Sequence, residues 1–586
     1  MKRNTPIRLL ALVLALAMLL CGCAASGKQD TASPDASGSQ KTNGSAAASE
    51  LASKYTYTAK YFNAPSAAQY VSASCMADGA LYLAAAQDGE MRTYTDEASG
   101  ESYQYNETGY QVYKMDLATG ESTPIGALIT DPREADAEGW TISQSLFDLQ
   151  PGKDGSLWLF WNVNRSRYDL PESFDPETDQ RYNYYVDGGN VIRAVELAAD
   201  GSIKQDLTLD PGETARPQTG DYVSFYPQRV LITSDGSFAA ASDRYAYLWS
   251  ADGTLAAALD NESYADLKRL NADTIGVVSY TGDSMKFQAL DAASKSWGET
   301  ITLPDSAWNP LPGNSQYDFF YNNGTALYGY KTDSGKEEKL VDWLACDVNS
   351  DSINGVYVDD SGKVCAILRD STGSYGYYIG GINVATTTND APGSPGASAS
   401  GWQVAVLTPT DAAAVTEKQE LTLACLYLPS TLRAQVLAFN RASDKYRIVV
   451  RDYSEYNTDE DYTAGLTKLN TEILSGNVPD MICTNQLPVA QYAAKGVLEE
   501  LWQYIDADPE LSRDQLLTQP LEAMQTGDGL YQITDSFAVS TAVALGKVVD
   551  GYDKWTVDAA KDALTKLQPN ATYFNVTYTK SDVLSQ

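Results

Sequence analysis

The chain has 586 residues, of which 43% are hydrophobic, and a formal net charge of −35. This length allows two or more folded domains, and the acidic balance argues against nucleic acid or anionic lipid as a partner, because both require a positive protein surface. The sequence contains no histidine, which excludes Ser-His-Asp and Cys-His nucleophile pairs and histidine-ligated metals, so an enzyme built here would depend on carboxylates, lysine or tyrosine.

The N-terminus predicts export and attachment to a membrane. A basic start precedes an apolar run at residues 7–20, and Cys21-Gly22-Cys23 follows directly after Leu20. These are the parts of a secretory signal, and a cysteine directly after Gly22 resembles a bacterial lipobox. We expect residues 1–22 to be removed and Cys23 to carry lipid, which would hold the protein on the extracellular side of the cell membrane. The alternative is an ordinary cleaved signal followed by a chance cysteine.

Residues 23–52 consist mostly of Ala, Ser, Gly, Asp, Lys and Thr. Such a segment buries too little apolar surface to offset the loss of chain entropy on folding. We expect it to be a flexible tether.

From about Tyr55 to Thr410, aromatic and β-branched residues alternate with polar ones, and turn dipeptides recur. Asp-Gly and Asn-Gly favour tight hairpins because both central positions need a positive φ. One series of such turns lies at 78–79, 154–155, 235–236, 272–273, 323–324 and 361–362, and a second lies at 119–120, 200–201, 252–253, 294–295 and 334–335. Two turns in each of about six units are what four-stranded propeller blades require. We therefore predict an all-β propeller over residues 53–415, with a β-sandwich as the alternative.

The end of this region contains a segment rich in Pro, Gly and Ser at residues 388–401. A strand-like run at 402–408 follows it. We expect the segment to be a long loop within the last blade, and the run to be the outer strand of that blade. The domain junction is then expected near 411–418.

After Glu420 the hydrophobic period changes. Three short apolar runs at 421–428, 446–453 and 480–484 are typical of buried parallel strands. They alternate with segments whose apolar residues recur at helical spacing, and Gly476 stands at the expected end of one such helix. This order predicts an α/β sheet within residues 416–586.

This C-terminal region resembles the extracellular solute-binding proteins of ABC importers, in the branch that takes sugars and oligosaccharides. The motifs that carry the resemblance are Phe439-Asn440-Arg441, a strand ending in Asp452-Tyr453, Ile473-x-x-Gly476-x-x-Pro479-Asp480, Lys495-Gly496-x-Leu498-x-x-Leu501, Asp528-Gly529-Leu530-Tyr531, Phe537 and Trp555-Thr556-x-Asp558. It implies a periplasmic-binding-protein-like lobe that captures a carbohydrate for an ABC permease, without a cofactor and without catalysis. The residues after Glu420 are too few for two lobes, so we expect this domain to be partial.

Ligands of open α/β sheets bind beyond the carboxyl ends of the strands. Amide, carboxylate and hydroxyl groups suit the hydroxyls of a sugar, and aromatic rings suit its apolar faces. The predicted ligand-binding residues are Tyr427, Tyr453, Asn485, Gln486, Asp535 and Phe537.

Other candidates are weaker. Asp347-x-Asn349-x-Asp351 begins like a calcium loop, but it lacks the turn glycine and the bidentate glutamate, so we expect an acidic turn and no metal site. The cysteines after the leader are too scattered for a disulfide framework and are expected to be mostly buried, with Cys346–Cys365 the one pairing considered. Two alternative functions stay open: a glycan-degrading enzyme with its site on the propeller axis, and a surface scaffold or sensor without transport.

Overall fold

The computed structural model describes residues 55–95, 102–130, 140–369, 376–379, 382–385, 401–534 and 551–566, with short gaps at 172, 176–178, 216–224, 243, 261–265, 272, 282–283, 412–414, 416–417, 459, 486 and 553–555. The signal, Cys23 and the tether lie outside these residues and stay predictions, as does the predicted loop at 388–400. Among the described residues, no helix combines the length and the apolar character needed to cross a membrane.

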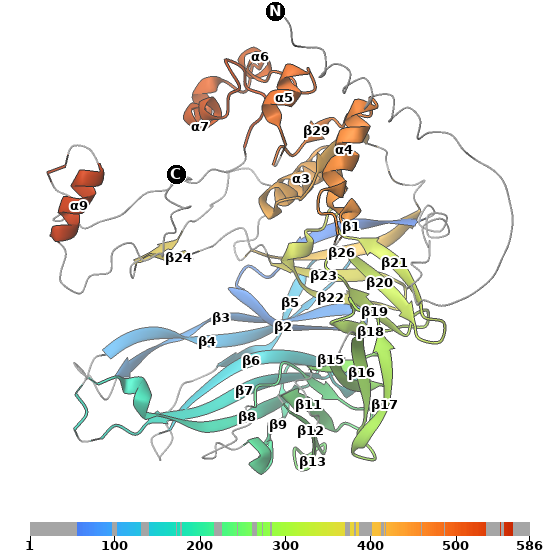
Figure 1. Cartoon of the computed structure of the whole chain (residues 1–586). Helices are drawn as coiled ribbons and strands as arrows, with labels where there is room; N and C mark the ends of the chain where they lie inside the picture. The colour runs from blue at the N-terminus through green and yellow to red at the C-terminus, as the bar shows by residue number, and fades with distance from the viewer. Residues whose placement is uncertain are drawn as a thin grey trace, which may run out of the picture. The chain divides into compact units, whose positions relative to one another are not determined.

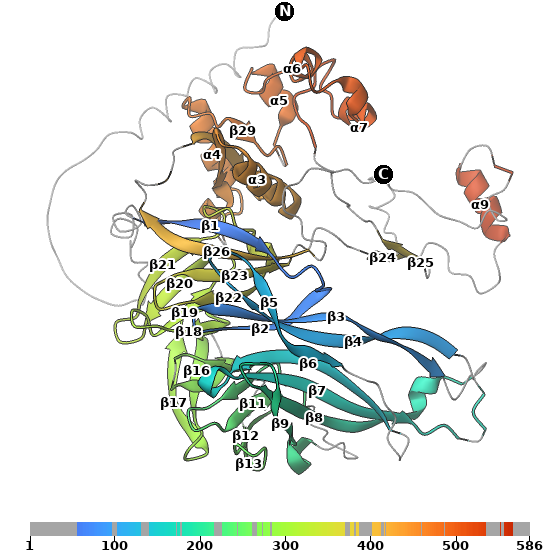
Figure 2. The same cartoon turned by 180° about the vertical axis from the view of Figure 1, so that it is seen from behind.

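Six four-stranded antiparallel sheets form a β-propeller (Figures 1 and 2). The first two blades are β2 (Tyr70–Ala77), β3 (Ala80–Thr95), β4 (Ser102–Met115) and β5 (Ser122–Thr130), then β6 (Thr141–Pro151), β7 (Leu157–Tyr168), β8 (Tyr185–Leu197) and β9 (Ile203–Leu209). The third and fourth are β10 (Val230–Ile232), β11 (Phe238–Ser242), β12 (Tyr245–Trp249) and β13 (Leu255–Asp260), then β14 (Asp266–Arg269), β15 (Ile275–Thr281), β16 (Ser284–Asp291) and β17 (Ser296–Leu303). The fifth is β18 (Pro310–Pro312), β19 (Phe319–Asn322), β20 (Ala326–Lys331) and β21 (Lys336–Asp342).

The sixth blade closes the ring with strands from both ends of the propeller region. Its order is β22 (Ile353–Val358), β23 (Val364–Arg369), β26 (Trp402–Asp411) and β1 (Tyr55–Asn63). β1 pairs with β26 over its whole length, with Tyr55 opposite Asp411. The prediction that the strand at 402–408 is outermost is therefore wrong, because β1 covers that edge. A separate hairpin, β24 (Gly376–Ile379) with β25 (Ile382–Ala385), lies between β23 and β26 in sequence.

The predicted turns lie where a propeller needs them, and the propeller prediction is confirmed. All turns of the second series join the third and fourth strands of a blade. Those of the first series join the first and second strands, except 323–324, which lies between β19 and β20. Asp78 and Gly79 have φ values of 49° and 71°, which both central positions of a type I′ turn require.

Hydrophobic side chains fill the space between successive blades. The rings of Trp158 in blade two and Phe238 in blade three meet edge to face, with centroids 4.9 Å apart. The five described cysteines are free thiols, of which only Cys483 is not fully buried. Thus the prediction of mostly buried cysteines is confirmed, and Cys346 and Cys365 form no bridge.

The chain after the propeller forms a small parallel sheet with helices. Its strands are β27 (Gln419–Cys425), β28 (Tyr446–Asp452) and β29 (Met481–Ile482), in the order β28-β27-β29. The helices are α3 (Ser430–Ala442), α4 (Ala464–Leu474), α5 (Val489–Ala494), α6 (Trp502–Ala507), α7 (Thr518–Ala523) and α9 (Val557–Thr565). The predicted alternation of strands and helices is present, but a periplasmic-binding-protein-like lobe is not shown: β29 has only 2 residues, and α5, α6 and α7 have 6 residues each.

Candidate functional site

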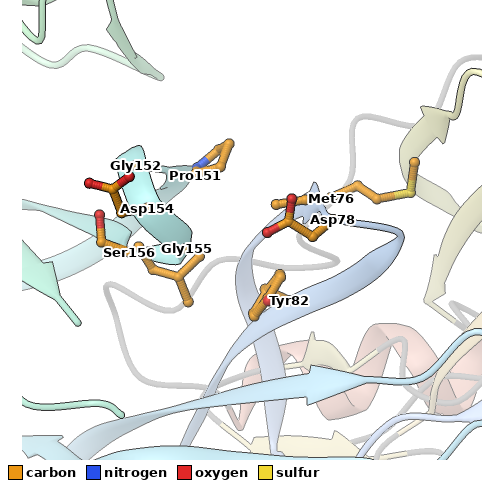
Figure 3. Close-up of a pocket in the computed structure, with 10 residues that line it drawn as sticks. Met76, Asp78, Tyr82, Pro151, Gly152, Asp154, Gly155 and Ser156 are labelled. Atoms are coloured by element: carbon orange, nitrogen blue, oxygen red, sulfur yellow. The ribbon is translucent and has the colours of Figure 1, made fainter. Parts of the chain in front are cut away.

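A hollow of about 500 Å³ lies between the first turn of blade one and the first turn of blade two (Figure 3). Asp78 stands on one side of it, and Asp154 and Ser156 stand on the other. The remaining lining residues are Met76, Ala77, Tyr82, Pro151, Gly152, Gly155 and Leu157. Residues from two different blades, Asp78 and Asp154 among them, therefore line the hollow.

Local backbone chemistry explains why aspartates stand at these two positions. Asp78 and Asp154 have φ values of 49° and 55°, a left-handed conformation that Asp tolerates better than most residues. In the second turn, the Gly152 N–H donates to the Ser156 carbonyl at 2.8 Å, and the Ser156 N–H donates to the Lys153 carbonyl at 3.0 Å. A short hydrogen-bonded turn thus holds Asp154 in place in the lining of the hollow.

The inner part of the hollow is built on rigid strands. Tyr82 on β3 is 7% exposed and Leu157 on β7 is 3% exposed. The ring of Tyr82 also lies 5.7 Å from the Lys114 ammonium group. These two buried side chains give the hollow a fixed apolar part within an otherwise polar lining.

The arrangement permits chemistry that works through two carboxylates. Hydrolysis of a glycosidic bond uses one carboxyl group as an acid and a second as a base or nucleophile, and this chain contains no histidine to serve instead. The two negative charges also favour a neutral ligand over an anionic one. The sequence revealed both aspartates only as turn residues, and their presence in the lining of one hollow depends on the packing of neighbouring blades.

A second group of ionisable residues lies on the innermost strands of the propeller. Asp148 on β6 is 5% exposed and accepts hydrogen bonds from the N–H groups of Leu149 and Val230, both at 2.9 Å. Burial raises the pKa of Asp148, against the opposing effects of Arg229 and of these hydrogen bonds. Because Val230 belongs to β10, the carboxyl group joins blade two to blade three, and we assign it a structural role.

Two further contacts lie near the axis, the first within β14 of blade four and the second between blades six and one. Lys268 on β14 pairs with Asp266 at 2.5 Å, and burial lowers the pKa of this lysine. The Tyr357 hydroxyl on β22 donates to the Ser74 carbonyl on β2 at 2.6 Å. The described axial groups therefore bind one another, which accounts for their burial without a ligand.

The predicted ligand-binding residues are only partly brought together. Tyr427, Tyr453 and Asn485 follow the carboxyl ends of β27, β28 and β29, which lie at one edge of the parallel sheet. Tyr427 is 69% exposed, whereas Tyr453 is buried and its hydroxyl donates to Glu472 at 2.6 Å. Gln486, Asp535 and Phe537 lie outside the described residues. Ligand binding at this edge stays a prediction.

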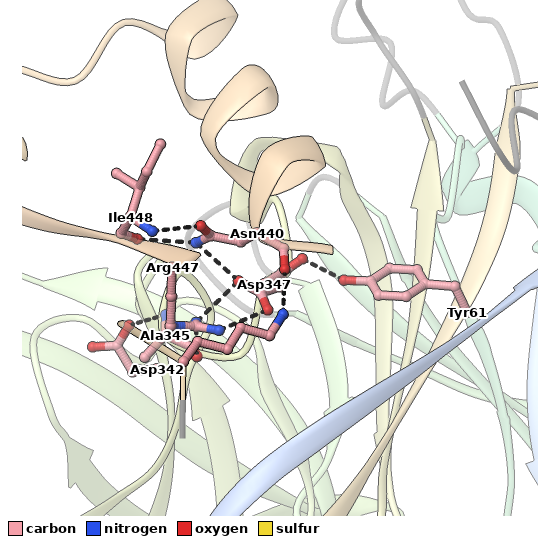
Figure 4. A network of polar contacts seen from close by, with 8 residues as sticks. Tyr61, Asp342, Ala345, Asp347, Asn440, Arg447 and Ile448 are labelled. Carbon is pink, nitrogen blue, oxygen red and sulfur yellow. Dashed lines mark hydrogen bonds and ion pairs between the residues drawn. The ribbon is translucent and has the colours of Figure 1, made fainter. Parts of the chain in front are cut away.

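The acidic turn at 347–351 contacts the α/β region (Figure 4). Both carboxylate oxygens of Asp347 accept hydrogen bonds from the Arg447 guanidinium, at 2.9 and 3.0 Å. Asp351 pairs with Arg433 on α3 at 2.5 Å. Asn440 donates to Asp347 at 3.3 Å. These acidic residues thus bind cationic and amide side chains from α3 and β28, a role that their sequence spacing did not indicate.

Comparisons with known proteins add similarities of fold. No family model matches the sequence, and no curated protein matches it. Among solved structures, a mutant of the NanB sialidase from Streptococcus pneumoniae matches with a TM-score of 0.31 and 10% identity, over 53% of this chain and 66% of that one. A protein of unknown function from Dyadobacter fermentans matches with a TM-score of 0.30 and 11% identity, over 61% and 95% of the two chains. The Dos1 propeller matches with a TM-score of 0.24 and 14% identity, over 53% and 69%. Similarities of this size assign neither activity nor site residues.

These findings correct three predictions. Membership of the ABC solute-binding family and capture of a carbohydrate for an importer are contradicted, because no family model matches the sequence and the described residues do not show a periplasmic-binding-protein-like lobe. The prediction that the chain has no enzymatic activity is corrected as well, since a sialidase is among the structures similar to it. The motifs behind the resemblance have local roles instead. Asn440 exchanges hydrogen bonds with the backbone of Ile448, at 2.7 and 2.9 Å, and Asp480 accepts from the Thr422 N–H at 2.8 Å. Gly476 follows α4 with a φ of 89°, as a helix C-terminus favours.

Proposed function

We propose that the protein hydrolyses glycosidic bonds at the hollow between blades one and two, with Asp78 and Asp154 as the reacting carboxyl groups. The observation that carries the proposal is the placement of these two aspartates on facing turns (Figure 3). Glycoside hydrolysis needs two carboxyl groups on either side of the scissile bond and no other ionisable side chain. The chemistry is therefore open to a chain that lacks histidine.

The remaining features of the hollow support a neutral sugar as the substrate. Its volume of about 500 Å³ falls within the range of roughly 300–1,000 Å³ that is usual for small-molecule sites. The Tyr82 ring supplies an apolar surface at its base, and such a surface suits the C–H faces of a sugar ring. An acidic sugar would meet two carboxylates and is disfavoured.

The test is hydrolysis of a panel of neutral polysaccharides by the purified protein and by the variants Asp78→Asn and Asp154→Asn. We expect each variant to lose activity by a factor of about 10² to 10⁴, with an unchanged melting temperature, since Asn also tolerates a positive φ. Asp235→Asn is the matched control, because Asp235 lies in the corresponding turn of blade three, outside the lining of the hollow. Absence of hydrolysis by the unaltered protein, or full activity of both variants, would overturn the proposal.

We also propose that this reaction takes place outside the cell. The support is the signal-like N-terminus with a cysteine after Gly22, which predicts lipid attachment at Cys23. Metabolic labelling with radioactive palmitate tests this step. We expect the natural chain to be labelled and Cys23→Ser to be unlabelled and released into the medium.

A further inference from the structure

Two aromatic rings stack on each other at the surface of blade four and the segment that follows it. Tyr280 lies near the end of β15, and Trp308 lies between β17 and β18. Their ring centroids are 5.5 Å apart and the ring planes differ by 26°. Tyr280 is 54% exposed and Trp308 is 62% exposed. The pair is therefore an open aromatic surface and not part of a core.

The backbone on both sides of this pair is fixed by buried residues. Ala307 is fully buried and donates its N–H to the Pro304 carbonyl at 2.9 Å, and Pro310 is also buried at the start of β18. Tyr280 pairs across the sheet with Met285, which is fully buried. Since both rings are attached to rigid positions, a ligand would find them ordered in advance, which lowers the entropic cost of binding.

From this geometry we propose that Tyr280 and Trp308 form a stacking platform for a neutral polysaccharide, distinct from the hydrolytic hollow. A large aromatic ring held open to water suits a ligand with an apolar face and polar edges, which describes a sugar ring. Asp305 and Asn309 are exposed in the same segment and offer a carboxylate and an amide to the hydroxyls of such a ligand.

Other classes of partner fit this surface less well. Stacking would also suit the bases of nucleic acid, but a chain with a net charge of −35 repels a phosphate backbone. A stable protein partner needs about 800 Å² on each side, whereas two partly exposed rings offer on the order of 250 Å².

The platform and the hollow lie at opposite ends of the blades. In an antiparallel blade, the turn between the first and second strands lies at one end, while the connection from blade to blade lies at the other. The hollow is lined by turns of the first kind, and Trp308 belongs to a connection of the second kind. The platform is thus a binding site in its own right, and it does not depend on the proposed hydrolysis.

Affinity electrophoresis of the full chain tests the platform. Gels contain soluble starch, laminarin, galactomannan or xylan, and the unaltered protein is expected to be retarded by at least one of them. We expect Trp308→Ala and Tyr280→Ala to weaken that binding about tenfold or more, and Trp308→Phe, which keeps a ring, to retain part of it. Tyr462→Ala removes a tyrosine that is 74% exposed on the α/β region, and it should bind as the unaltered chain does.

The outcomes separate this proposal from the hydrolytic one. If Asp78→Asn is retarded like the unaltered chain and Trp308→Ala is not retarded, the result supports the platform, whether or not any hydrolysis is found. Thermal melts of the variants establish that they are folded. No retardation by any of the four polysaccharides, or equal retardation of Trp308→Ala and the unaltered chain, would overturn the platform.

Discussion

Arg447 on β28 and Asp347 on the segment between β21 and β22 form a two-pronged ion pair across 100 residues of sequence, with N–O distances of 2.9 and 3.0 Å (Figure 4). The Arg447 side chain is 26% exposed and that of Asp347 is 18% exposed. The guanidinium also donates to the Ala345 carbonyl at 2.6 Å. Paired geometry of this kind is among the stronger polar contacts in proteins, and it attaches the parallel sheet to the propeller.

Removal of the Arg447–Asp347 ion pair should weaken the contact between the parallel sheet and the propeller. We expect Arg447→Ala to destabilise the contact by about 2 kcal/mol, because Asp347 is left partly buried without its main cation. Hydrogen exchange in β28 should accelerate, while exchange in the propeller strands stays unchanged. Arg513→Ala is the control, since its pair with Asp506 is 45% and 51% exposed and should contribute little. Equal exchange in β28 of both variants would contradict the expectation.

The hydrogen bond between Tyr357 and Ser74 should contribute to closure of the propeller. It joins β22 of the sixth blade to β2 of the first, at 2.6 Å. We expect Tyr357→Phe to lower the free energy of unfolding by about 1 kcal/mol, measured by urea titration. Tyr504→Phe, which loses an exposed contact of 3.4 Å to Glu499, should leave the free energy unchanged. If the free energy of unfolding changed by the same amount in both variants, the hydrogen bond between the blades would contribute no more than an exposed contact.

Glu196 should make stability depend on pH. Burial raises its pKa, but hydrogen bonds from Lys204 and Gln205, at 2.7 and 3.0 Å, outweigh this and hold the pKa below its ordinary value of 4.5. A carboxyl group whose pKa is lower in the folded protein than in the unfolded chain stabilises the fold fully at pH values above its unfolded-state pKa. This stabilisation is lost as the pH falls through the folded-state pKa. We expect Glu196→Gln to cost about 1 kcal/mol at pH 7, and the difference to shrink below pH 4.5.

The measurement for Glu196 is chemical unfolding at pH values from 7 down to 3. Glu299→Gln, on the exposed surface of β17, is the matched variant and should track the unaltered protein at every pH. If the difference in the free energy of unfolding between Glu196→Gln and the unaltered protein grew as the pH fell, the direction assigned to the pKa shift of Glu196 would be wrong.

Gly201 should tolerate no larger residue. It lies in the turn between β8 and β9 with a φ of 82°, and an added Cβ would stand 2.1 Å from the backbone nitrogen of Gly126 in the neighbouring blade. We expect Gly201→Ala to cost at least about 2 kcal/mol, from backbone strain and from the forced separation of the blades. Gly324 has a φ of 94° with no atom within 4 Å of such a Cβ, so Gly324→Ala should cost only about 1 kcal/mol. Melting temperatures of the two variants check this difference.

Local features of the fold could be predicted from the sequence, and contacts between distant residues could not. Tight turns such as Asp78-Gly79 depend on the φ preferences of adjacent residues, which the sequence shows directly. The pairing of Tyr55 with Asp411 depends on the edge of β26 being open to another strand, and the hydrophobic periodicity of the sequence does not show which strand edges are open. Asp78 and Asp154 were likewise visible only as turn residues, because their placement around one hollow follows from the order of blades in space.

In the α/β region, the alternation of strands and helices was predicted correctly, but the protein family inferred from it was wrong. Asn440, Gly476 and Asp480 stood at family-like spacings, yet in the structure they bind a neighbouring strand or end a helix. Any short α/β unit needs such residues, so a series of them in order identifies the kind of local structure and not the protein family.

The pairing of β1 with β26 imposes an order on biosynthesis. A ribosome makes β1 first, but its partner strand ends only at Asp411, so β1 has no native neighbour during most of translation. Until then its backbone donors and acceptors are available to other chains. A nascent propeller of this type must therefore be protected from misassociation for the time that some 350 further residues take to appear, about 20–70 s at usual rates of synthesis.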